Sequence, residues 1–241
     1  MLGNYYKAES YVSHTSSKKG LINFLYQKVR KRTLKQKVSL ISRVSKGKKL
    51  LDFGCGTGHF LAAARAGGFD VLGLEPDPDA RKLAKELNGI QALSRDELQG
   101  IEKGFDMITL WHVLEHLPEL NSDIEKLKSL LADDGALLIA VPNPASADAA
   151  HYKEHWAAYD VPRHLYHFSP SVLRRLFERH GFRCVETLPM KYDAYYVSML
   201  SEKIKGGGVL KGFWQGWKSN RNARRVPDAW SSQIYIFKKQ A

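Results

Sequence analysis

Short apolar segments alternate with helical segments along most of the 241-residue chain. The expected strands fall at residues 49–53, 71–75, 90–93, 105–111, 135–141, 182–188 and 233–238. Apolar residues recur at helical spacing near residues 58–67, 77–88 and 119–132. This alternation predicts an α/β fold, in which a largely parallel sheet is wrapped by helices.

A long basic helix is expected ahead of the first strand, from Lys18 to about Val44. One face of this helix would carry its apolar side chains, which are Leu21, Ile22, Leu25 and Val29. About 40 residues separate the last two strands, far more than a hairpin needs, so we expect an inserted cap there. The expected parts are a basic helical arm or lid, a core, the cap and a last core strand, at 1–47, 48–188, 189–231 and 232–241.

Composition favours one globular domain with additions, because 44% hydrophobic residues over this length can bury a sizeable core. The chain has no run of eighteen apolar residues, and its N-terminus is polar and charged, so we expect a soluble, cytoplasmic protein. Two cysteines, Cys55 and Cys184, offer no disulfide framework and suit a reducing compartment.

The net charge of +12 is concentrated at the two ends of the chain. Residues 1–49 hold 13 Lys or Arg and one acid, and residues 200–241 hold nine and two. Residues 50–199, in contrast, hold 15 basic and 22 acidic residues. This asymmetry predicts an acidic partner or an anionic surface, such as the inner face of a membrane. The alternative is that the charge only keeps exposed helices in solution.

A glycine-rich turn follows the first expected strand. Gly54, Gly56 and Gly58 lie between the apolar run and the next helix. Glycine is needed where the backbone turns tightly and a ligand must approach it, and the following helix directs its free N–H groups at that ligand. The turn therefore predicts a site for a nucleotide-containing cofactor.

Two acids and a histidine decide which cofactor is favoured. Asp52 stands two residues before the first glycine, where it would repel a pyrophosphate but could reach an ammonium group. His59 occupies the position at which a dinucleotide fingerprint needs a third small residue. Glu75 ends the second strand, where two ribose hydroxyls would need a bidentate acceptor. The two acids thus favour an adenosylated amino acid such as S-adenosylmethionine.

With these residues, the chain resembles the class I S-adenosylmethionine-dependent methyltransferases from about Leu50 to Cys184. Residues 105–117 are similar to the fourth-strand motif of that family, and residues 135–143 are similar to its fifth strand. Residues 160–170, with the sequence DVPRHLYHFSP, resemble a loop of one broad bacterial subgroup. The resemblance implies a Rossmann-like, doubly wound sheet of seven strands whose last two strands form an antiparallel edge.

The resemblance also extends the cofactor site. It adds residues in the two turns, at the end of the fourth-strand motif and on the adenine side, namely Cys55, Pro76, Leu110, Trp111 and Ser94. Tyr11 and His14 would contact the methionyl carboxylate, because an N-terminal segment often folds over the cofactor in related enzymes. A leader that takes no part in binding is the alternative for these two residues.

Histidines are the candidates for acid–base chemistry, since methyl transfer to a hydroxyl or a protonated amine needs a base. His112 lies just after the fourth-strand motif, and His116 follows one helical turn later, where it could instead cap a helix. His164 with Arg163 is the preferred pair for a base or an anion grip, and His167 is the substitute. The alternative for the loop is structural, with Arg163 holding an acid or a carbonyl.

A metal site is not expected. His151 and His155 have helical spacing, and His164 could add a third ligand. However, no glutamate-bearing zinc motif and no cysteine pair accompanies them.

Three functions remain open. The leading one is methyl transfer to an oxygen or nitrogen of a small, acidic, lipid-linked or glycan-type acceptor, with peripheral contact to an anionic membrane surface. The second is methylation of RNA or another nucleic acid, which the basic arms and the aromatic residues of the cap would suit. The third is a cofactor-binding interaction protein without catalysis. Acceptor identity lies beyond the sequence, because the substrate loops of such a fold vary freely.

Overall fold

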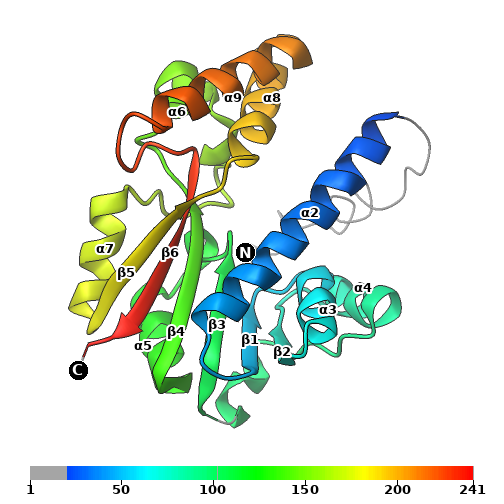
Figure 1. Ribbon diagram of the computed structural model, residues 1–241, viewed down its shortest axis with the longest axis vertical. Coiled ribbons are helices and arrows are strands. Elements are labelled where there is room, and N and C mark those ends of the chain that lie inside the picture. The colour runs from blue at the N-terminus through cyan, green and yellow to red at the C-terminus, as the bar shows by residue number, and fades with distance from the viewer. Residues whose placement is uncertain (1–20, 102, 241) are drawn as a thin grey trace. The chain divides into compact units, whose positions relative to one another are not determined.

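The computed structural model describes residues 21–101 and 103–240, which form two compact units (Figure 1). The first unit comprises residues up to Leu110 together with Lys126–Leu137. The second comprises Trp111–Glu125 and the residues from Leu138 onward. Tyr11 and His14 lie outside the described residues, so their expected role in the cofactor site is not addressed by the structure.

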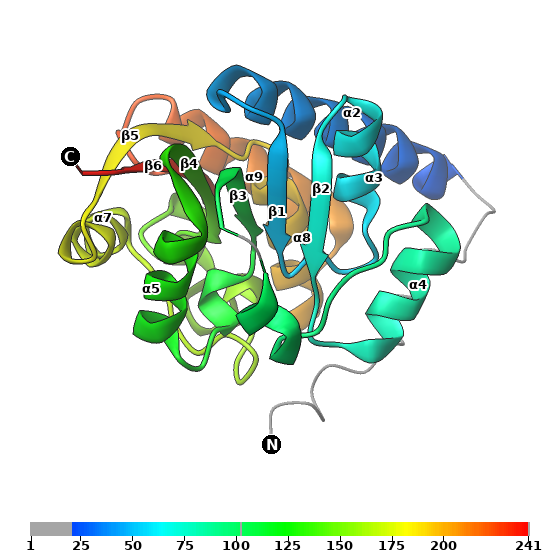
Figure 2. The same cartoon turned by 90° about the horizontal axis from the view of Figure 1, so that it is seen from below.

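The first unit is built from alternating helices and strands (Figure 2). In chain order these are α2 (Leu21–Val44), β1 (Lys49–Phe53), α3 (His59–Ala66), β2 (Asp70–Leu74), α4 (Pro78–Asn88), the 3-10 turn η2 (Asp96–Gly100) and β3 (Phe105–Trp111). β1 pairs in parallel with both β2 and β3, so that Asp52 lies opposite Gly73 on one side and Thr109 on the other. The carboxyl ends of the three strands therefore share one edge of the sheet.

Local chemistry explains where the helices of this unit begin and end. Asp77 caps α4 because its carboxylate accepts hydrogen bonds from the backbone N–H groups of Asp79 and Ala80, and Pro78 occupies the first turn. Gly89 ends α4 in the left-handed conformation, which glycine adopts without steric cost. Helix α4 thus starts directly after the acidic turn that follows β2.

The second unit carries the remaining elements, and three elements run through both units. The shared elements are β3, whose last residue Trp111 belongs to the second unit, α5 (Leu120–Leu130) and β4 (Leu131–Pro142). The second unit also contains three 3-10 turns and one short helix, which are η3 (Leu114–His116), α6 (Ala147–Tyr152), η4 (Lys153–His155) and η5 (Ala157–Tyr159). The longer elements are α7 (Pro170–Arg179), β5 (Phe182–Pro189), α8 (Asp193–Ile204), α9 (Val209–Ala223) and β6 (Ser232–Lys239). Helices α8 and α9 form an antiparallel hairpin between β5 and β6 (Figure 1).

The α/β expectation is confirmed, with one difference in the sheet. The described residues form six strands in the order β2-β1-β3-β4-β6-β5, and β5 pairs with β6 in antiparallel fashion. The strand expected at residues 90–93 is reduced to a single bridge between Leu93 and Leu74. The seventh strand is therefore absent from the described part of the chain.

Helix α2 differs from its expected amphipathic pattern. Val29 was expected on the apolar face but is exposed, whereas Ile41 near the end of the helix is fully buried. Lys37 lies over the ring of Phe60 in α3, and the side chain of Arg30 contacts His59 at the start of α3. Helix α2 thus packs on α3 through its C-terminal half and through long basic side chains.

A buried carboxylate holds the hairpin in the second unit. Asp148 in α6 is fully buried and accepts hydrogen bonds from the indole of Trp156 at 2.9 Å and from two hydroxyls at 2.6 Å. The hydroxyls belong to Ser219 in α9 and to Ser231 just before β6. A buried charge is tolerated only when it is fully hydrogen-bonded, so this carboxylate fixes three segments to one another.

No helix among the described residues is long and apolar enough to cross a lipid bilayer.

Candidate active site

The glycine turn has the geometry that its sequence predicts. Gly54, Gly56 and Gly58 all have positive φ angles, of 79°, 53° and 76°. These are left-handed backbone conformations, which side chains with a Cβ rarely adopt. The backbone N–H groups of Gly54 and Cys55 both donate to the carbonyl of Leu74, so the turn is tied to the end of β2.

Glu75 lies beside this turn and is oriented by the backbone. Its two carboxylate oxygens accept hydrogen bonds from the N–H of Gly56 at 2.8 Å and from the N–H of Asp77 at 3.0 Å. Burial raises the pKa of Glu75, and the two backbone hydrogen bonds act in the opposite direction. Each carboxylate oxygen can accept a second hydrogen bond, so Glu75 retains capacity for the hydroxyls of a ligand.

Asp52 is the second buried acid of this unit. The hydroxyl of Thr109 donates to its carboxylate at 2.6 Å. Burial raises the pKa of Asp52 to about 7, despite the opposing effects of that hydrogen bond and of the nearby Lys37. A buried carboxylate of this kind is stabilised in its charged form by a ligand cation. Asp52 therefore fits the positively charged end of S-adenosylmethionine.

The other expected cofactor residues of the first unit have different surroundings. Burial raises the pKa of the Cys55 thiol, which keeps it protonated and makes it a poor nucleophile. Ser94 donates its hydroxyl and its N–H to Glu97. Leu110 is fully buried in β3, and Trp111, the first residue of the second unit, is half-buried. Pro76 follows Glu75 directly, and its carbonyl accepts from Arg81.

His112 is the residue that follows β3, and carboxylates surround its ring. Its Nε2 lies 3.1 Å from Asp193 of α8, and its Nδ1 lies 3.5 Å from Glu115. Burial alone would lower the pKa of His112, but these two carboxylates outweigh it and raise the pKa to about 9. His112 is therefore a cation at neutral pH and not a free base. Its backbone is also left-handed, with φ of 56°, a costly conformation for a residue with a side chain.

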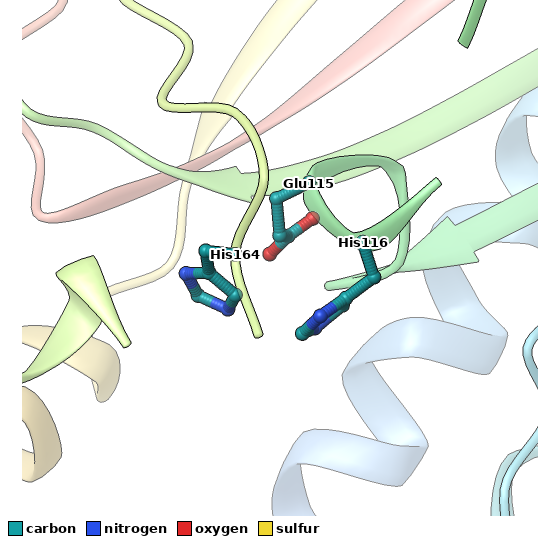
Figure 3. A group of neighbouring side chains, drawn as sticks. All are labelled: Glu115, His116 and His164. Carbon is teal, nitrogen blue, oxygen red and sulfur yellow. The ribbon is translucent and has the colours of Figure 1, made fainter. Parts of the chain in front are cut away.

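A second group of side chains lies in the same unit: Glu115 and His116 from η3 and His164 from the loop before α7. Figure 3 shows the three side chains gathered around one space. One ligand atom from each lies within 4.8 Å of the others. The rings of His116 and His164 meet edge to face at 4.6 Å between centroids. Backbone N–H groups of Leu165 and Tyr166 donate to the carbonyl of Glu115, which joins the loop to η3.

The tautomer of His164 follows from its contacts. Its Nδ1 lies 2.9 Å from the carbonyl oxygen of Ala158. A carbonyl oxygen can only accept, so Nδ1 must carry a proton. Burial lowers the pKa of His164, and the ring is consequently neutral at pH 7. The lone pair then lies on Nε2, whose charged neighbour is Asp160 at 3.8 Å.

Arg163 and His167 are held by contacts within the loop. The guanidinium of Arg163 donates twice to one oxygen of Asp160, at 2.6 and 3.1 Å, which is the structural role considered for it. Nε2 of His167 donates to the carbonyl of Tyr159 at 2.9 Å. His116 likewise donates from Nδ1 to the carbonyl of Arg163 at 3.0 Å. These contacts order the loop around His164.

The group in Figure 3 has the donor types that bind a divalent cation, a carboxylate and two imidazoles. The set of histidines that was considered from the sequence, and not expected to bind a metal, was His151, His155 and His164. Of these three, the group contains only His164. His155 instead lies 3.3 Å from Glu154.

The sequence analysis did not identify two acids of the second unit, Glu115 and Asp193, as candidate site residues. Glu115 was recognised only as part of a motif, although the spacing of His112, Glu115 and His116 on one turn could have drawn attention to it. Asp193 lies 81 residues after His112 and belongs to no motif. Its contact with His112 is recognised only from the structure, in which α8 brings the two side chains together.

Together, the parallel strands, the left-handed glycine turn, the acid near the end of β1 and the acid after β2 are the features of an α/β enzyme with a cofactor site at the carboxyl ends of its strands. A family model described as a methyltransferase domain matches residues 26–187. The chain therefore belongs to this family, and it is an S-adenosylmethionine-dependent methyltransferase.

Several curated relatives carry one name. The chain is 34% identical over 168 residues to a ubiquinone biosynthesis O-methyltransferase from Glaesserella parasuis, an alignment that covers 61% of this chain and 70% of the relative. It is 40% identical over 111 residues to the enzyme of the same name from Actinobacillus pleuropneumoniae. That alignment covers 40% of this chain and 47% of the relative, so the chain spans about half the length of this relative.

A solved structure shares the fold. It is a magnesium protoporphyrin IX methyltransferase from Synechocystis PCC 6803 with bound SAH, at a TM-score of 0.63 and 14% identity. The match covers 99% of this chain and 97% of that one. At this identity the likeness establishes the fold alone.

Proposed function

We propose that this enzyme transfers the methyl group of S-adenosylmethionine to an oxygen of a small acceptor that is acidic or linked to a lipid. The neutral, half-buried His164 carries the proposal, because its Nε2 lone pair is directed to accept a proton. The O-methyltransferase names of the relatives favour oxygen over nitrogen. A glycan-type acceptor remains within the same proposal.

His164 is the proposed base. S-adenosylmethionine, when bound, supplies an electrophilic methyl group on its sulfonium sulfur. A hydroxyl acceptor attacks well only when its proton is removed, and a positioned histidine contributes about 10² to 10⁴-fold to such a step. The hydrogen bond from Nδ1 to Ala158 fixes the ring in the tautomer that presents Nε2. The buried carboxylate of Glu115 would stabilise the imidazolium that forms.

His112 has a separate proposed role. Since it is charged and both of its ring nitrogens face carboxylates, of Asp193 and Glu115, it would tie α8 to η3 and would not remove a proton. His112 directly follows β3, whose Thr109 bonds Asp52 of the cofactor site.

A divalent cation held by Glu115, His116 and His164 would serve the same step by a different route, since a bound metal lowers the pKa of a coordinated hydroxyl. The two routes make opposite predictions for a chelator. Activity that survives exhaustive treatment with EDTA supports His164 as the base. Activity that is lost and then restored by one divalent metal supports the metal route.

A nucleic-acid substrate is the alternative function. It is favoured by the basic side chains that line one side of α2: Arg32, Lys35 and Arg43. In that case binding to RNA would fall steeply with salt and would need no lipid. Retention of no RNA or DNA at low salt would remove this alternative.

The test is the release of S-adenosylhomocysteine from the purified protein with paired acceptors. Each pair consists of a phenol or carboxylic acid with an alkyl chain and the same compound without the chain. We expect turnover with the hydroxylated acceptors, faster with the alkylated member. Turnover with amines or with RNA only would contradict the proposal.

The role of His164 is tested by His164→Ala, with His167→Ala as the matched control in the same loop. We expect His164→Ala to lower kcat by about 10²-fold or more while the Kd for S-adenosylmethionine stays near the wild-type value. In the wild type, kcat/KM should fall with acid below a pKa under 6.5, because the base must be neutral. An equal loss in both variants would return His164 to a structural role.

A further inference from the structure

Helix α9 buries its small and polar side chains and exposes its large apolar ones, the reverse of a typical amphipathic helix. Its buried positions are small or polar: Gly212, Gly216, Ser219, Asn220 and Ala223. Its largest apolar side chains face outward, and these are Leu210, Phe213, Trp214 and Trp217, with exposed fractions of 81%, 52%, 60% and 39%. A surface helix of a globular protein normally buries such residues. We call these four residues the α9 stripe.

The glycines explain how the helix is fixed in this orientation. A Cβ on Gly212 would lie 2.6 Å from the backbone of Met199, and a Cβ on Gly216 would lie 2.6 Å from the carbonyl of Ala194. Both contacts are with α8, so the two helices touch backbone to backbone through glycines four residues apart. Rotating α9 to bury the stripe would put large side chains where only glycine fits. The exposure of the stripe is thus built into the hairpin.

The stripe is continuous along the helix and reaches the tip of the hairpin. Leu210 lies three residues before Phe213 and four before Trp214, and Trp217 lies four and three residues after these two, which places all four on one side of α9. Val209, at the tip, is 66% exposed. Trp214 and Trp217 are in edge-to-face contact at 5.3 Å between centroids. Isolated exposed apolar residues need no explanation, but a contiguous group of this size marks an interaction surface.

The charge around the stripe identifies the kind of partner. Residues 203–227 contain seven Lys or Arg and no Asp or Glu: Lys203, Lys205, Lys211, Lys218, Arg221, Arg224 and Arg225. The guanidinium of Arg221 lies 5.5 Å from the ring centre of Trp217. Basic residues beside tryptophan, phenylalanine and leucine on one exposed helix are the composition of helices that lie in a membrane interface.

We propose that the α9 stripe docks onto an anionic lipid bilayer, with its apolar side chains among the acyl-chain boundary and the flanking cations at the headgroups. The docking would bring the enzyme to a lipid-linked acceptor at the membrane. Only this link to the acceptor rests on the proposed function. The docking itself depends on neither the acceptor nor the cofactor.

The test is sedimentation of the full chain with vesicles of phosphatidylcholine alone or with 30% phosphatidylglycerol, a composition chosen at about the anionic content that attracts basic segments. We expect binding to the mixed vesicles that weakens with salt. Leu210→Ser with Trp214→Ser should lower the partition constant at least about tenfold, and Lys218→Gln with Arg225→Gln about 30-fold, since each cation near the surface contributes about 1 kcal/mol, or roughly fivefold.

Matched controls distinguish binding through the α9 stripe from nonspecific binding of exposed apolar side chains to vesicles. Leu87→Ser removes an apolar side chain that is 53% exposed on α4 of the other unit, and it should leave vesicle binding unchanged. Binding of S-adenosylmethionine should be unchanged in the stripe variants, which keeps failure of docking distinct from failure of the enzyme. Equal vesicle binding by wild type and the Leu210/Trp214 variant would overturn the proposal. A stripe that instead mediates dimers in solution, or RNA binding without lipid, would overturn it as well.

Discussion

The acids of the candidate site have different partners in the two units. In the first unit, Glu75 is held by backbone N–H groups and Asp52 by the hydroxyl of Thr109. In the second unit, Glu115 and Asp193 lie on either side of the protonated His112. The first unit therefore leaves negative charge for a cationic ligand to neutralise, whereas the second neutralises its own. A sulfonium cofactor suits the first arrangement, whereas the cation of the second is already paired with two carboxylates.

The largest expected effect comes from Glu75→Ala. The variant removes the acceptor of two backbone hydrogen bonds and of the ribose hydroxyls proposed to bind there. We expect the Kd for S-adenosylmethionine, measured by calorimetric titration, to rise about 100-fold, the equivalent of about 3 kcal/mol. Glu86→Ala is the control, because Glu86 is an exposed acid on α4 of the same unit. An affinity within threefold of wild type would break the assignment of the cofactor site.

A smaller effect is expected for Asp52→Asn, which should stabilise the folded protein in the absence of cofactor. The pKa of Asp52 is about 7 in the folded protein and near 3.8 in the unfolded chain, so ionisation opposes folding as the pH rises through this range. Asparagine keeps the hydrogen bond from Thr109 and removes the charge. Without cofactor, the variant should be more stable than wild type at pH 8, by about 2 kcal/mol or several degrees in Tm. The gain should shrink towards pH 5.

Asp52→Asn should also bind S-adenosylmethionine more weakly. This loss would show that Asp52 contributes to ligand binding and is not only a buried acid that destabilises the fold. Wild-type affinity should decline as the pH falls below 7, because the protonated acid no longer attracts a cation. Thermal melts and titrations over pH 5 to 8 measure both effects. A variant that is destabilised at pH 8 would contradict the electrostatic argument.

The smallest effect is expected for Asp193→Asn. The loss of one carboxylate should lower the pKa of His112 from about 9 towards its ordinary value of 6.5, as measured by NMR titration of labelled histidine. Asp228→Asn, which breaks an ion pair with Arg174 elsewhere in the second unit, is the control and should leave this pKa unchanged. An unchanged pKa in Asp193→Asn would mean that Glu115 alone sustains the cation.

The cofactor half was largely predictable because its signals are local. The three glycines, the acid before them and the acid after β2 lie within 24 residues, and each glycine is required by a left-handed φ angle. The His112–Asp193 pair could not be predicted, because α8 brings the acid back from a distant part of the chain. Local pattern therefore identifies the methyl donor more readily than the acceptor site.

The strand expected at residues 90–93 is reduced to one bridge among the described residues for a local reason. Ile90 to Leu93 is apolar enough for a strand, but Leu93 makes only two backbone bonds, with Gly73 and Glu75. Ser94 is then bonded by Glu97 as the chain enters a 3-10 turn. A four-residue apolar run does not specify whether pairing continues beyond one bridge.

Asp148 has a consequence for motion. Its carboxylate joins α6 to Trp156, to Ser219 of α9 and to Ser231 before β6 through three buried hydrogen bonds. Opening the α8–α9 hairpin away from α6 would break the hydrogen bond from Ser219 and leave the buried carboxylate under-satisfied, at a cost of about 1–3 kcal/mol or more. The hairpin is thus anchored to α6, and its opening is opposed by the loss of this bond.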